Sequence, residues 1–399
     1  MEAGDGSAVK FRVFAAMAMA AGAMSIDSIL PAFSRIRGEL HLPEGSSATA
    51  GLLTLFFVGS AIGQIPMGLF ADRFGRRTLV SSAAVVYLIG IGVVAISSSL
   101  GAMLVGRFVW GFGAAGLQIG AISMLRDRFV GARMAREMAF VMAVFYVVPV
   151  LAPSVGAGII AIAPWRTVLA VSGVFGAMLF IGARLMPDTL PVERRQPFQL
   201  AVVGKGVKAI VSNGSTVRIV LMMATAFSVF SSYLGSSERI VGDVFGRKSM
   251  FPFLFGAVGI LMAMVALTVG RHVMGIGLAK VIRTAAAVYS SIALVILVVV
   301  LVNHGVPPFW LYWPLLSVQL ASHIGLYPNL NSAAMTRVGH LAGTASAIIT
   351  TMAMLVGSLV GSVIDHTFDG TVRPLAIAFG ISAVTVLALS RTIGSIEHT

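Results

Sequence analysis

Long apolar stretches alternate with short polar ones along the whole chain. Each apolar stretch is roughly 18 to 25 residues long, the length that an α-helix needs to cross about 30 Å of hydrocarbon. We expect twelve helices, at 11–33, 49–71, 78–97, 100–125, 137–161, 165–186, 217–237, 251–270, 284–303, 309–330, 342–364 and 372–392. The pattern therefore predicts an all-α membrane protein with twelve transmembrane helices.

The longest polar stretch, 187–216, separates six of these helices from the other six. We therefore expect a tail at 1–10, a first six-helix bundle at 11–186, a linker at 187–216, a second bundle at 217–392 and a tail at 393–399. The first residues lack the basic segment and cleavage site of a signal peptide. Two sets of six helices are typical of secondary transporters built from repeats.

The composition excludes several classes of protein. Only 11% of the 399 residues are charged and 57% are hydrophobic, whereas a soluble domain carries about 25% charged residues. The chain has no cysteine, which excludes disulfides, thiolate metal sites and thiol catalysis. We find no HExxH motif, paired acids or Ser/His/Asp spacing, so we expect neither an enzyme nor a metal or other cofactor.

The net charge of +13 follows the loops and not a basic face. Seven cations fall on one side of the expected membrane: Arg35, Arg37, Arg166, Arg239, Arg247, Lys248 and Arg373. Arg107 lies inside a helix, and the remaining 20 of the 28 Lys and Arg residues fall on the other side with both termini. Because basic loops stay in the cytoplasm, we expect cytoplasmic termini and linker in a cell membrane, and no nucleic-acid partner.

The polar turn "GLFADRFGRR" at 68–77 joins the second and third expected helices. Glycines here allow close helix approach and a tight turn with positive φ. A fixed acid at the membrane edge can receive the positive N-terminus of another helix, and the arginines can hold that acid and bind lipid headgroups. A basic turn that only obeys the topology rule is the alternative.

This turn resembles the signature of the major facilitator superfamily, roughly G-x-L-x-D-R-x-G-R-R. The matching residues are Gly68, Leu69, Asp72, Arg73, Gly75, Arg76 and Arg77. The resemblance implies that the turn is a cytoplasmic latch, which docks on the helix beginning near "HLAGTASA" while the cytoplasmic side is closed. The corresponding turn of the second half, "GRHVMGIGLAKVIR", keeps the basic residues but lacks the acid.

Other stretches resemble the drug:proton antiporters with twelve helices, of the bicyclomycin and chloramphenicol exporter (Bcr/CflA) type. "SIDSILPAF" resembles the signature of their first helix, and "GRFVWGFGAAG" resembles their R-x-x-x-G-x-G motif. "VVPVLAPSVGAG" resembles their antiporter motif, with Pro149, Pro153 and Gly156 in this chain, although three glycines of the motif are replaced. The resemblance implies exchange transport with restricted leak.

Asp27 and Arg107 are the two ionisable residues that lie deep in expected helices. They fall at similar depth, in the first and fourth helices, which the resemblance makes neighbours. We expect a pair or a water-bridged relay in which Asp27 exchanges a proton. An inert ion pair and a direct substrate contact are the alternatives.

Four further ionisable residues are weaker candidates. Glu238 and Arg239 are expected in a solvated loop, Asp365 at the membrane interface, and His323 as a satisfied buried histidine. A role in a cavity or in proton transfer is the alternative for each.

The expected substrate cavity is large and mostly apolar, with scattered hydrogen-bonding groups. Its candidate residues are Met24, Gln118, Tyr146, Ser231, Tyr233, Asn329 and Asn331. Such a lining suits a lipophilic compound better than a sugar. With a single carboxyl on the first helix, we expect neutral or zwitterionic substrates.

Together these features predict proton-coupled efflux of phenicol- or bicyclomycin-like compounds by alternating access. The partners would be a small-molecule drug, protons and the lipid bilayer, with a proton gradient as the energy source and the chain acting as a monomer. An uptake or facilitative carrier for a small metabolite is the main alternative. A receptor or channel with twelve helices would not need a latch.

Overall fold

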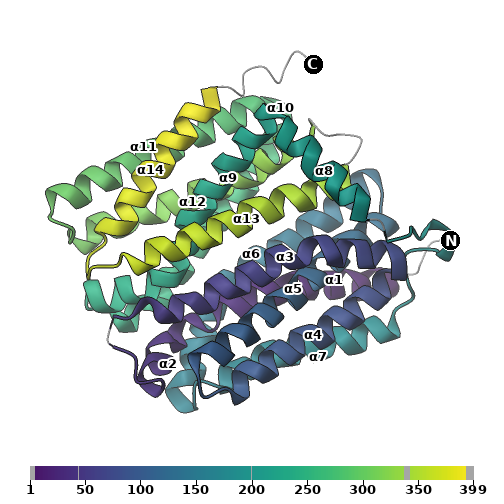
Figure 1. Cartoon of the computed structure of the whole chain (residues 1–399), viewed down its shortest axis with the longest axis horizontal. Helices are drawn as coiled ribbons and strands as arrows, with labels where there is room; N and C mark the ends of the chain where they lie inside the picture. Colours follow the sequence, from purple (N-terminus) through teal and green to yellow (C-terminus); the bar gives the residue numbers. More distant parts are fainter. Residues whose placement is uncertain (1–4, 44, 199, 337–341, 392–399) are drawn as a thin grey trace. The chain divides into compact units, whose positions relative to one another are not determined.

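The structure is a computed structural model of the chain, and it describes residues 5–43, 45–198, 200–336 and 342–391. The described residues form helices, turns and irregular segments, without strands. Twelve of these helices are long (Figure 1): α1 (Asp5–Asp27), α3 (Gly51–Phe74), α4 (Arg76–Ile96), α5 (Leu100–Arg128), α6 (Gly131–Ile162), α7 (Thr167–Leu185), α9 (Gly214–Arg239), α10 (Phe251–Ile276), α11 (Leu278–Val302), α12 (Phe309–Thr336), α13 (Ala342–His366) and α14 (Arg373–Ser390).

The predicted all-α fold class is confirmed. Eleven helical segments of the described chain are long and apolar enough to cross a membrane. The remaining long helix, α12, carries Gln319, His323 and two asparagines, and these polar side chains lower its mean hydropathy. Polar residues in a membrane helix are costly, so α12 is a helix on which to look for functional groups.

Local sequence signals explain where the helices begin and end. Gly75 separates α3 from α4 with a φ of +91°, a backbone conformation that side chains disfavour. Ser99 caps α5 by accepting a hydrogen bond from the backbone N–H of Ala102 at 3.3 Å. Asn213 caps α9 in the same way through the N–H of Thr216 at 3.0 Å.

Shorter elements fill the connections. They are η1 (Leu30–Ala32), α2 (Phe33–Glu39), η2 (Ser47–Ala50), η3 (Val192–Arg194), α8 (Leu200–Ser212), the π-helical turn η4 (Ile240–Val244) and η5 (Lys248–Met250). Within the expected linker, α8 forms because apolar residues recur at helical spacing in "LAVVGKGVKAIVS", as at Val203, Val207 and Ile210.

The chain divides into two compact units. The first comprises residues 1–41 and 55–200, and the second comprises residues 42–54 and 201–399. The second unit therefore includes η2 and the first residues of α3. The range expected for the first bundle from the sequence, 11–186, also contains these residues.

The two units have the same internal packing pattern. In the first unit α4 packs against α5 and α7, while α1 packs against α6 and α5. In the second unit α11 packs against α12 and α14, while α9 packs against α13 and α12. Figure 1 shows α4 beside α7 and α11 beside α14. Each unit thus pairs its third helix with its fourth and sixth, and its first with its fifth and fourth, as expected of a repeat.

Candidate functional site

The first membrane helix breaks next to Asp27, the buried acid that the sequence singles out. α1 ends at Asp27, and the chain makes the short turn η1 before α2. The cause is Pro31, which has no N–H to donate to the carbonyl of Asp27 four residues earlier. The backbone N–H and the hydroxyl of Ser28 both donate to the carbonyl of Met24, at 3.2 and 2.6 Å. Asp27 is buried at this break, with 4% of its surface exposed.

α6 packs closely against the same break. A Cβ atom at Gly156 would overlap the backbone carbonyl oxygen of Ser28. Only glycine fits this approach without a shift of one helix, so Gly156 positions α6 directly beside Asp27. Pro149 and Pro153 lie in the same helix, which continues through both of them.

Arg107 is fully buried in α5. Its Nη1 donates to the backbone carbonyl of Ser25 at 2.9 Å. The guanidinium lies 4.7 Å from the ring centroids of both Phe56 and Trp110, so two cation–π contacts hold it between α3 and α5. Tyr87 of α4 packs edge-on against Trp110 and contacts the Ser25 hydroxyl at 2.7 Å.

Asp27 and Arg107 are thus brought to the same end of α1 without a direct bond. Arg107 contacts the carbonyl two residues before Asp27, and none of the described cations forms an ion pair with the Asp27 carboxyl. Neither the expected direct pair nor the inert ion pair is therefore formed among the described residues, and the water-bridged relay and the substrate contact stay predictions. The packing of α1 against α5 confirms that these helices are neighbours.

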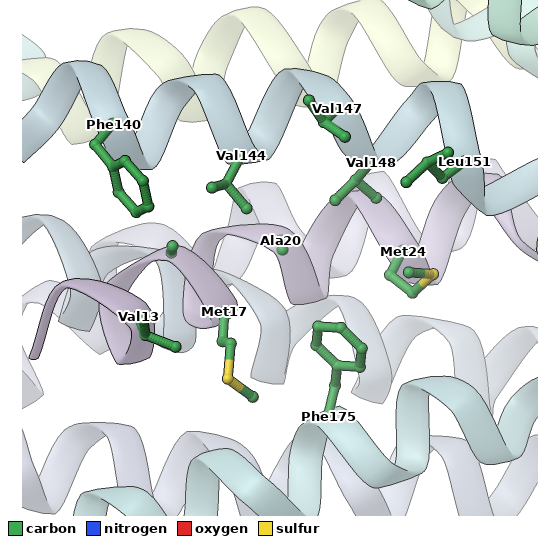
Figure 2. A pocket seen from close by; sticks show the side chains of 11 residues that line it. Val13, Met17, Ala20, Met24, Phe140, Val144, Val147, Val148, Leu151 and Phe175 are labelled. Atoms are coloured by element: carbon green, nitrogen blue, oxygen red, sulfur yellow. The ribbon is translucent and has the colours of Figure 1, made fainter. Parts of the chain in front are cut away.

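An apolar cavity of about 330 Å³ lies one turn before Asp27, between α1, α6 and α7. Met17, Ala20 and Met24 of α1 line it, as Figure 2 shows. Val144, Val148 and Leu151 of α6 and Phe175 of α7 complete its walls. Met24, a candidate from the sequence, is among the lining residues, and Asp27 lies three residues beyond it, outside the lining.

Two other cavity candidates belong to the first unit. The amide of Gln118 packs on α1, because a Cβ at Gly22 would lie 2.5 Å from its Nε2 atom. Gln118 is therefore next to α1 but does not line the cavity described above. The side chain of Tyr146 lies outside the described residues.

The candidates in the second unit are used for helix packing. The Ser231 hydroxyl donates to the carbonyl of Ser228 at 3.1 Å and approaches that of Gly357 on α13 at 3.4 Å. Tyr233 stacks on Phe255 of α10 with centroids 6.1 Å apart. Asn329 donates back to the carbonyl of Gly325 at 2.8 Å.

A polar face of α12 is a better candidate for ligand contacts. His323, Tyr327 and Asn331 follow one another at four-residue spacing, so they share one face of the helix. His323 Nδ1, Tyr327 Oη and Asn331 Oδ1 are each buried, and none has a hydrogen-bond partner among the described residues. Buried polar atoms normally have partners, so this face has unused capacity to bind a ligand.

Aromatic side chains surround this face. Phe230 of α9 stacks on the His323 ring at 4.8 Å, and His323 stacks on Tyr327 at 5.3 Å. Phe227 of α9 packs on Tyr327 at 6.0 Å. Asn331 was a sequence candidate and His323 a weaker one, whereas Tyr327 was missed, although its four-residue spacing from both was visible in the sequence.

The α3–α4 turn, residues 68–77, forms a network of ion pairs. Arg76 Nη1 contacts Asp72 at 2.7 Å, and its Nε contacts Asp127 at the end of α5 at 3.0 Å. The backbone N–H of Arg76 donates to Asp188 Oδ1 at 2.9 Å. Arg77 donates to the carbonyl of Arg184 at 2.6 Å. The turn is therefore fastened to the ends of both α5 and α7.

Asp188 is a bonding partner of this turn that the sequence did not predict. Its carboxyl also contacts Arg195 at 3.2 Å, and a Cβ at Gly75 would overlap it. Residues 72 and 188 are far apart in sequence, so no local signal connects them. The expected partner of Asp72 begins near residue 340, and the side chains of 341–344 lie outside the described residues.

The expectation of a solvated loop at Glu238 and Arg239 is wrong. α9 continues through Arg239, and both side chains are buried, with 3% and 1% exposed. Asp365 of α13 is also buried and accepts a hydrogen bond from Ser232 at 2.8 Å. Arg239 lies 4.0 Å from Asp365, stacks over Phe368 and donates to the carbonyl of Gly45 at 3.1 Å. Tertiary contacts with the 42–54 segment bury this end of α9.

Comparisons with known proteins agree with this architecture. A family model described as Major Facilitator Superfamily matches residues 13–362. The uncharacterized MFS-type transporter YdgK of Bacillus subtilis (strain 168) is 27% identical over 380 residues, covering 92% of this chain and 91% of its own. The Bicyclomycin resistance protein homolog of Haemophilus influenzae is 25% identical over 374 residues, covering 91% of each.

Similar solved structures support the fold but nothing further, because their sequence identity to this chain is low. The crystal structure of a D-xylose-proton symporter matches with a TM-score of 0.78 at 12% identity, over 97% of this chain and 96% of that one. The human organic anion transporter MFSD10 matches with a TM-score of 0.66 at 15% identity, over 96% of this chain and 99% of its own.

Proposed function

Since the chain belongs to the Major Facilitator Superfamily, we propose that it exports lipophilic small molecules in exchange for protons. It is a membrane transporter and not an enzyme. The similarity to a protein named for bicyclomycin resistance supports drug export as the direction and substrate class.

One observation carries the proton coupling: the Asp27 carboxyl is buried at the break of α1, and no described cation pairs with it. A buried carboxylate that nothing neutralises is costly. A proton or a bound substrate can remove that cost, and the two would compete for the same group. Such competition is the requirement for exchange transport, because one ligand must leave before the other binds.

Arg107 and Gly156 would act on Asp27 through the backbone. Arg107 holds the carbonyl of Ser25, and Gly156 lets α6 approach the carbonyl of Ser28. Asp27 thus lies in the sequence between two residues, Ser25 and Ser28, whose backbones contact α5 and α6. A movement of either helix would change the access of Asp27 to water and to substrate, which is the coupling that alternating access requires.

The substrate would be lipophilic, with a few hydrogen-bonding groups. The cavity between α1, α6 and α7 is apolar, and methionines such as Met17 and Met24 adapt to different shapes. The α12 face of His323, Tyr327 and Asn331 supplies both a donor and acceptors between aromatic rings. Neutral or zwitterionic compounds of phenicol or bicyclomycin type combine apolar surface with a few hydrogen-bonding groups, which suits each of these two features by itself.

The α3–α4 turn would be the cytoplasmic latch of this cycle. Its network with Asp127 and Asp188 gives the turn a fixed shape before any other helix docks on it. The distribution of basic residues supports cytoplasmic termini in a cell membrane. The chain would act as a monomer, with the proton gradient as its energy source.

The test is transport by purified protein in sealed proteoliposomes with an imposed proton gradient. We expect Asp27→Asn to insert and fold normally but to lose gradient-driven accumulation of a fluorescent lipophilic substrate, because the amide cannot exchange a proton. Glu193→Gln removes a carboxyl that is exposed in η3 and should transport like the unmodified protein. Unchanged uphill transport by Asp27→Asn would remove Asp27 from the mechanism.

The same vesicles separate export from its alternatives. A facilitative carrier would equilibrate the substrate without responding to the proton gradient, and an uptake symporter would move it in the direction of the protons. A resistance profile of cells expressing the chain then identifies the substrates, because export lowers the sensitivity of cells only to compounds that the protein carries.

A further inference from the structure

A second, larger cavity lies wholly within the second unit. It has a volume of about 470 Å³ and lies between α10, α11 and α12. Its walls are almost entirely apolar, with Leu261 and Val265 on α10 and Ala285 and Val288 on α11. Gly325 forms part of the floor, where an added Cβ would make only ordinary contacts, the nearest at 3.6 Å from Val265. We call this cavity the α10–α12 groove.

One end of the groove reaches the turn between α10 and α11. Thr268 and His272 line it near the end of α10, and Val281 and Thr284 line it near the start of α11. Lys280 lies one turn before Thr284 on the same helix face, and Arg271 follows Thr268 by three residues. Both cations are exposed. The groove therefore has a basic end and an apolar end.

The α10–α11 turn has the backbone of the α3–α4 turn without its acids. Gly277 has a φ of +89° and Gly75 a φ of +91°, and each precedes the first residue of a helix. Three residues earlier the first turn has Asp72, whereas the second has Met274. In the first turn three carboxyl groups, those of Asp72, Asp127 and Asp188, bind Arg76 and its backbone N–H.

The sequence on either side of the second turn lacks acids that could play the part of these carboxyl groups. The sequence contains no Asp or Glu between Asp243 and Asp365, a region that includes all of α10, α11 and α12. None of the described acidic side chains forms an ion pair with Arg271 or Lys280. Exposed cations grouped at the end of an apolar groove attract anions, and an anion attached to an apolar group would contact both parts of the groove.

The length of the groove fits one leaflet of a bilayer. Its lining on α10 runs from Leu261 to His272, which is about 16 Å at 1.5 Å per residue. Half of a hydrocarbon core of about 30 Å is about 15 Å. An acyl chain that fills the groove would therefore place its headgroup at the level of Arg271 and Lys280.

We propose that the α10–α12 groove binds an acyl chain of an anionic phospholipid, with the phosphate held by Arg271 and Lys280. The bound lipid supplies the negative charge that Asp72, Asp127 and Asp188 supply at the other turn. This inference does not depend on the transported substrate or on proton coupling, because it concerns a lipid site in one unit.

The test is photo-crosslinking in nanodiscs of phosphatidylcholine. A small fraction of phosphatidylglycerol with a diazirine on one acyl chain is added, and the labelled peptides are identified by mass spectrometry. A parallel sample uses phosphatidylcholine with the same diazirine chain. We expect the anionic probe to label 261–272, 281–288 or 318–325 more strongly than the zwitterionic probe does.

Variants separate the headgroup contact from the groove. Removing the charges in Arg271→Gln and Lys280→Gln should lower the anionic labelling by about fivefold for each charge at low salt, without affecting the zwitterionic probe. The matched control, Lys205→Gln with Lys208→Gln, removes two exposed charges from α8 and should leave groove labelling unchanged. Gly325→Phe fills the floor and should lower groove labelling by both probes.

Size-exclusion chromatography checks that each variant is folded. Equal labelling by the two probes, or labelling that does not respond to Arg271→Gln and Lys280→Gln, would overturn the proposal. Displacement of the anionic probe by excess chloramphenicol would also overturn it, because the groove would then be a drug site.

Discussion

At the scale of single residues, two fully buried arginines of the described chain combine backbone carbonyls with aromatic rings. Arg107 combines a carbonyl bond at 2.9 Å with two ring contacts at 4.7 Å. Arg239 likewise combines the carbonyl of Gly45 with the ring of Phe368. A planar guanidinium makes both kinds of contact at once, which a lysine ammonium does not. Because rings and carbonyls carry no net charge, these contacts hold the Arg107 guanidinium without an ion pair to Asp27.

Gly75 provides the sharpest test at this scale. Its φ of +91° disfavours any side chain, and a Cβ there would overlap the Asp188 carboxyl. We expect Gly75→Ala to lower the free energy of unfolding of the protein by about 1–3 kcal/mol and to loosen the turn that holds Asp72. The measurement is the fraction of protein that stays monodisperse by size-exclusion chromatography after heating in detergent.

Gly68→Ala is the matched control for that experiment. It lies in the same turn motif, but an added Cβ would meet no described atom within 4 Å. Gly68 is also helical and has a negative φ, so alanine should be neutral or slightly stabilising there. If both variants lost the same fraction of monodisperse protein on heating, the positive φ of Gly75 and its close contact with Asp188 would not stabilise the turn.

At the scale of elements, the sequence predicted the helices well because the membrane determines their length and hydropathy. The range 100–125 corresponds to α5 (Leu100–Arg128), and 251–270 corresponds to α10 (Phe251–Ile276). The ends differ by a few residues where helices extend beyond the apolar stretch into polar residues such as Arg128. The break of α1 at Asp27 and the helix α8 were not predicted, because a hydropathy window averages over a single proline and over short amphipathic segments.

The candidate site was predicted less completely, for a physical reason. Asp27, Arg107 and the α3–α4 turn have local signals, since an ionisable residue in an apolar run is visible in one dimension. The partners of these residues have no such signal, because they are distant in sequence. Asp188 contacts Arg76 over a separation of 112 residues, and Arg239 contacts Gly45 over a separation of 194 residues. Burial of Glu238 likewise depends on segments that only the fold brings together.

The contact of α6 with the break of α1 gives a prediction for these elements. Because a Cβ at Gly156 would overlap the carbonyl of Ser28, Gly156→Ala should push α6 away from Asp27 and cost about 1–3 kcal/mol through overpacking. We expect gradient-driven transport to fall more steeply than the amount of folded protein. Transport per folded molecule in proteoliposomes is the measurement.

Gly158→Ala, two residues along the same helix, is the control. A Cβ at Gly158 would meet no described atom within 4 Å, so alanine should leave transport unchanged and favour the helix slightly. If both variants transported normally, the close approach at Gly156 would have no part in coupling.

At the scale of the whole molecule, the two units repeat one packing pattern with different chemistry. The first unit carries Asp27 and the acid-rich α3–α4 turn, whereas the second carries the polar face of α12 and an acid-free turn. A repeat that had kept both features in each unit would present two proton sites and two latches. Under the proposed function, Asp27 of the first unit would exchange the proton, and the α12 face of the second unit would supply hydrogen bonds to a ligand.

The orientation in the membrane can be tested directly because the chain has no cysteine. Single cysteines at Glu193→Cys, in the linker, and Thr367→Cys, after α13, replace exposed residues. With cytoplasmic termini, a membrane-impermeant maleimide should label Thr367→Cys in intact cells and label Glu193→Cys only after the membrane is opened. The reverse pattern would place both basic turns, α3–α4 and α10–α11, on the outside. A latch at that turn would then close the outer entrance, and the excess of basic residues would contradict the topology rule from which the orientation was inferred.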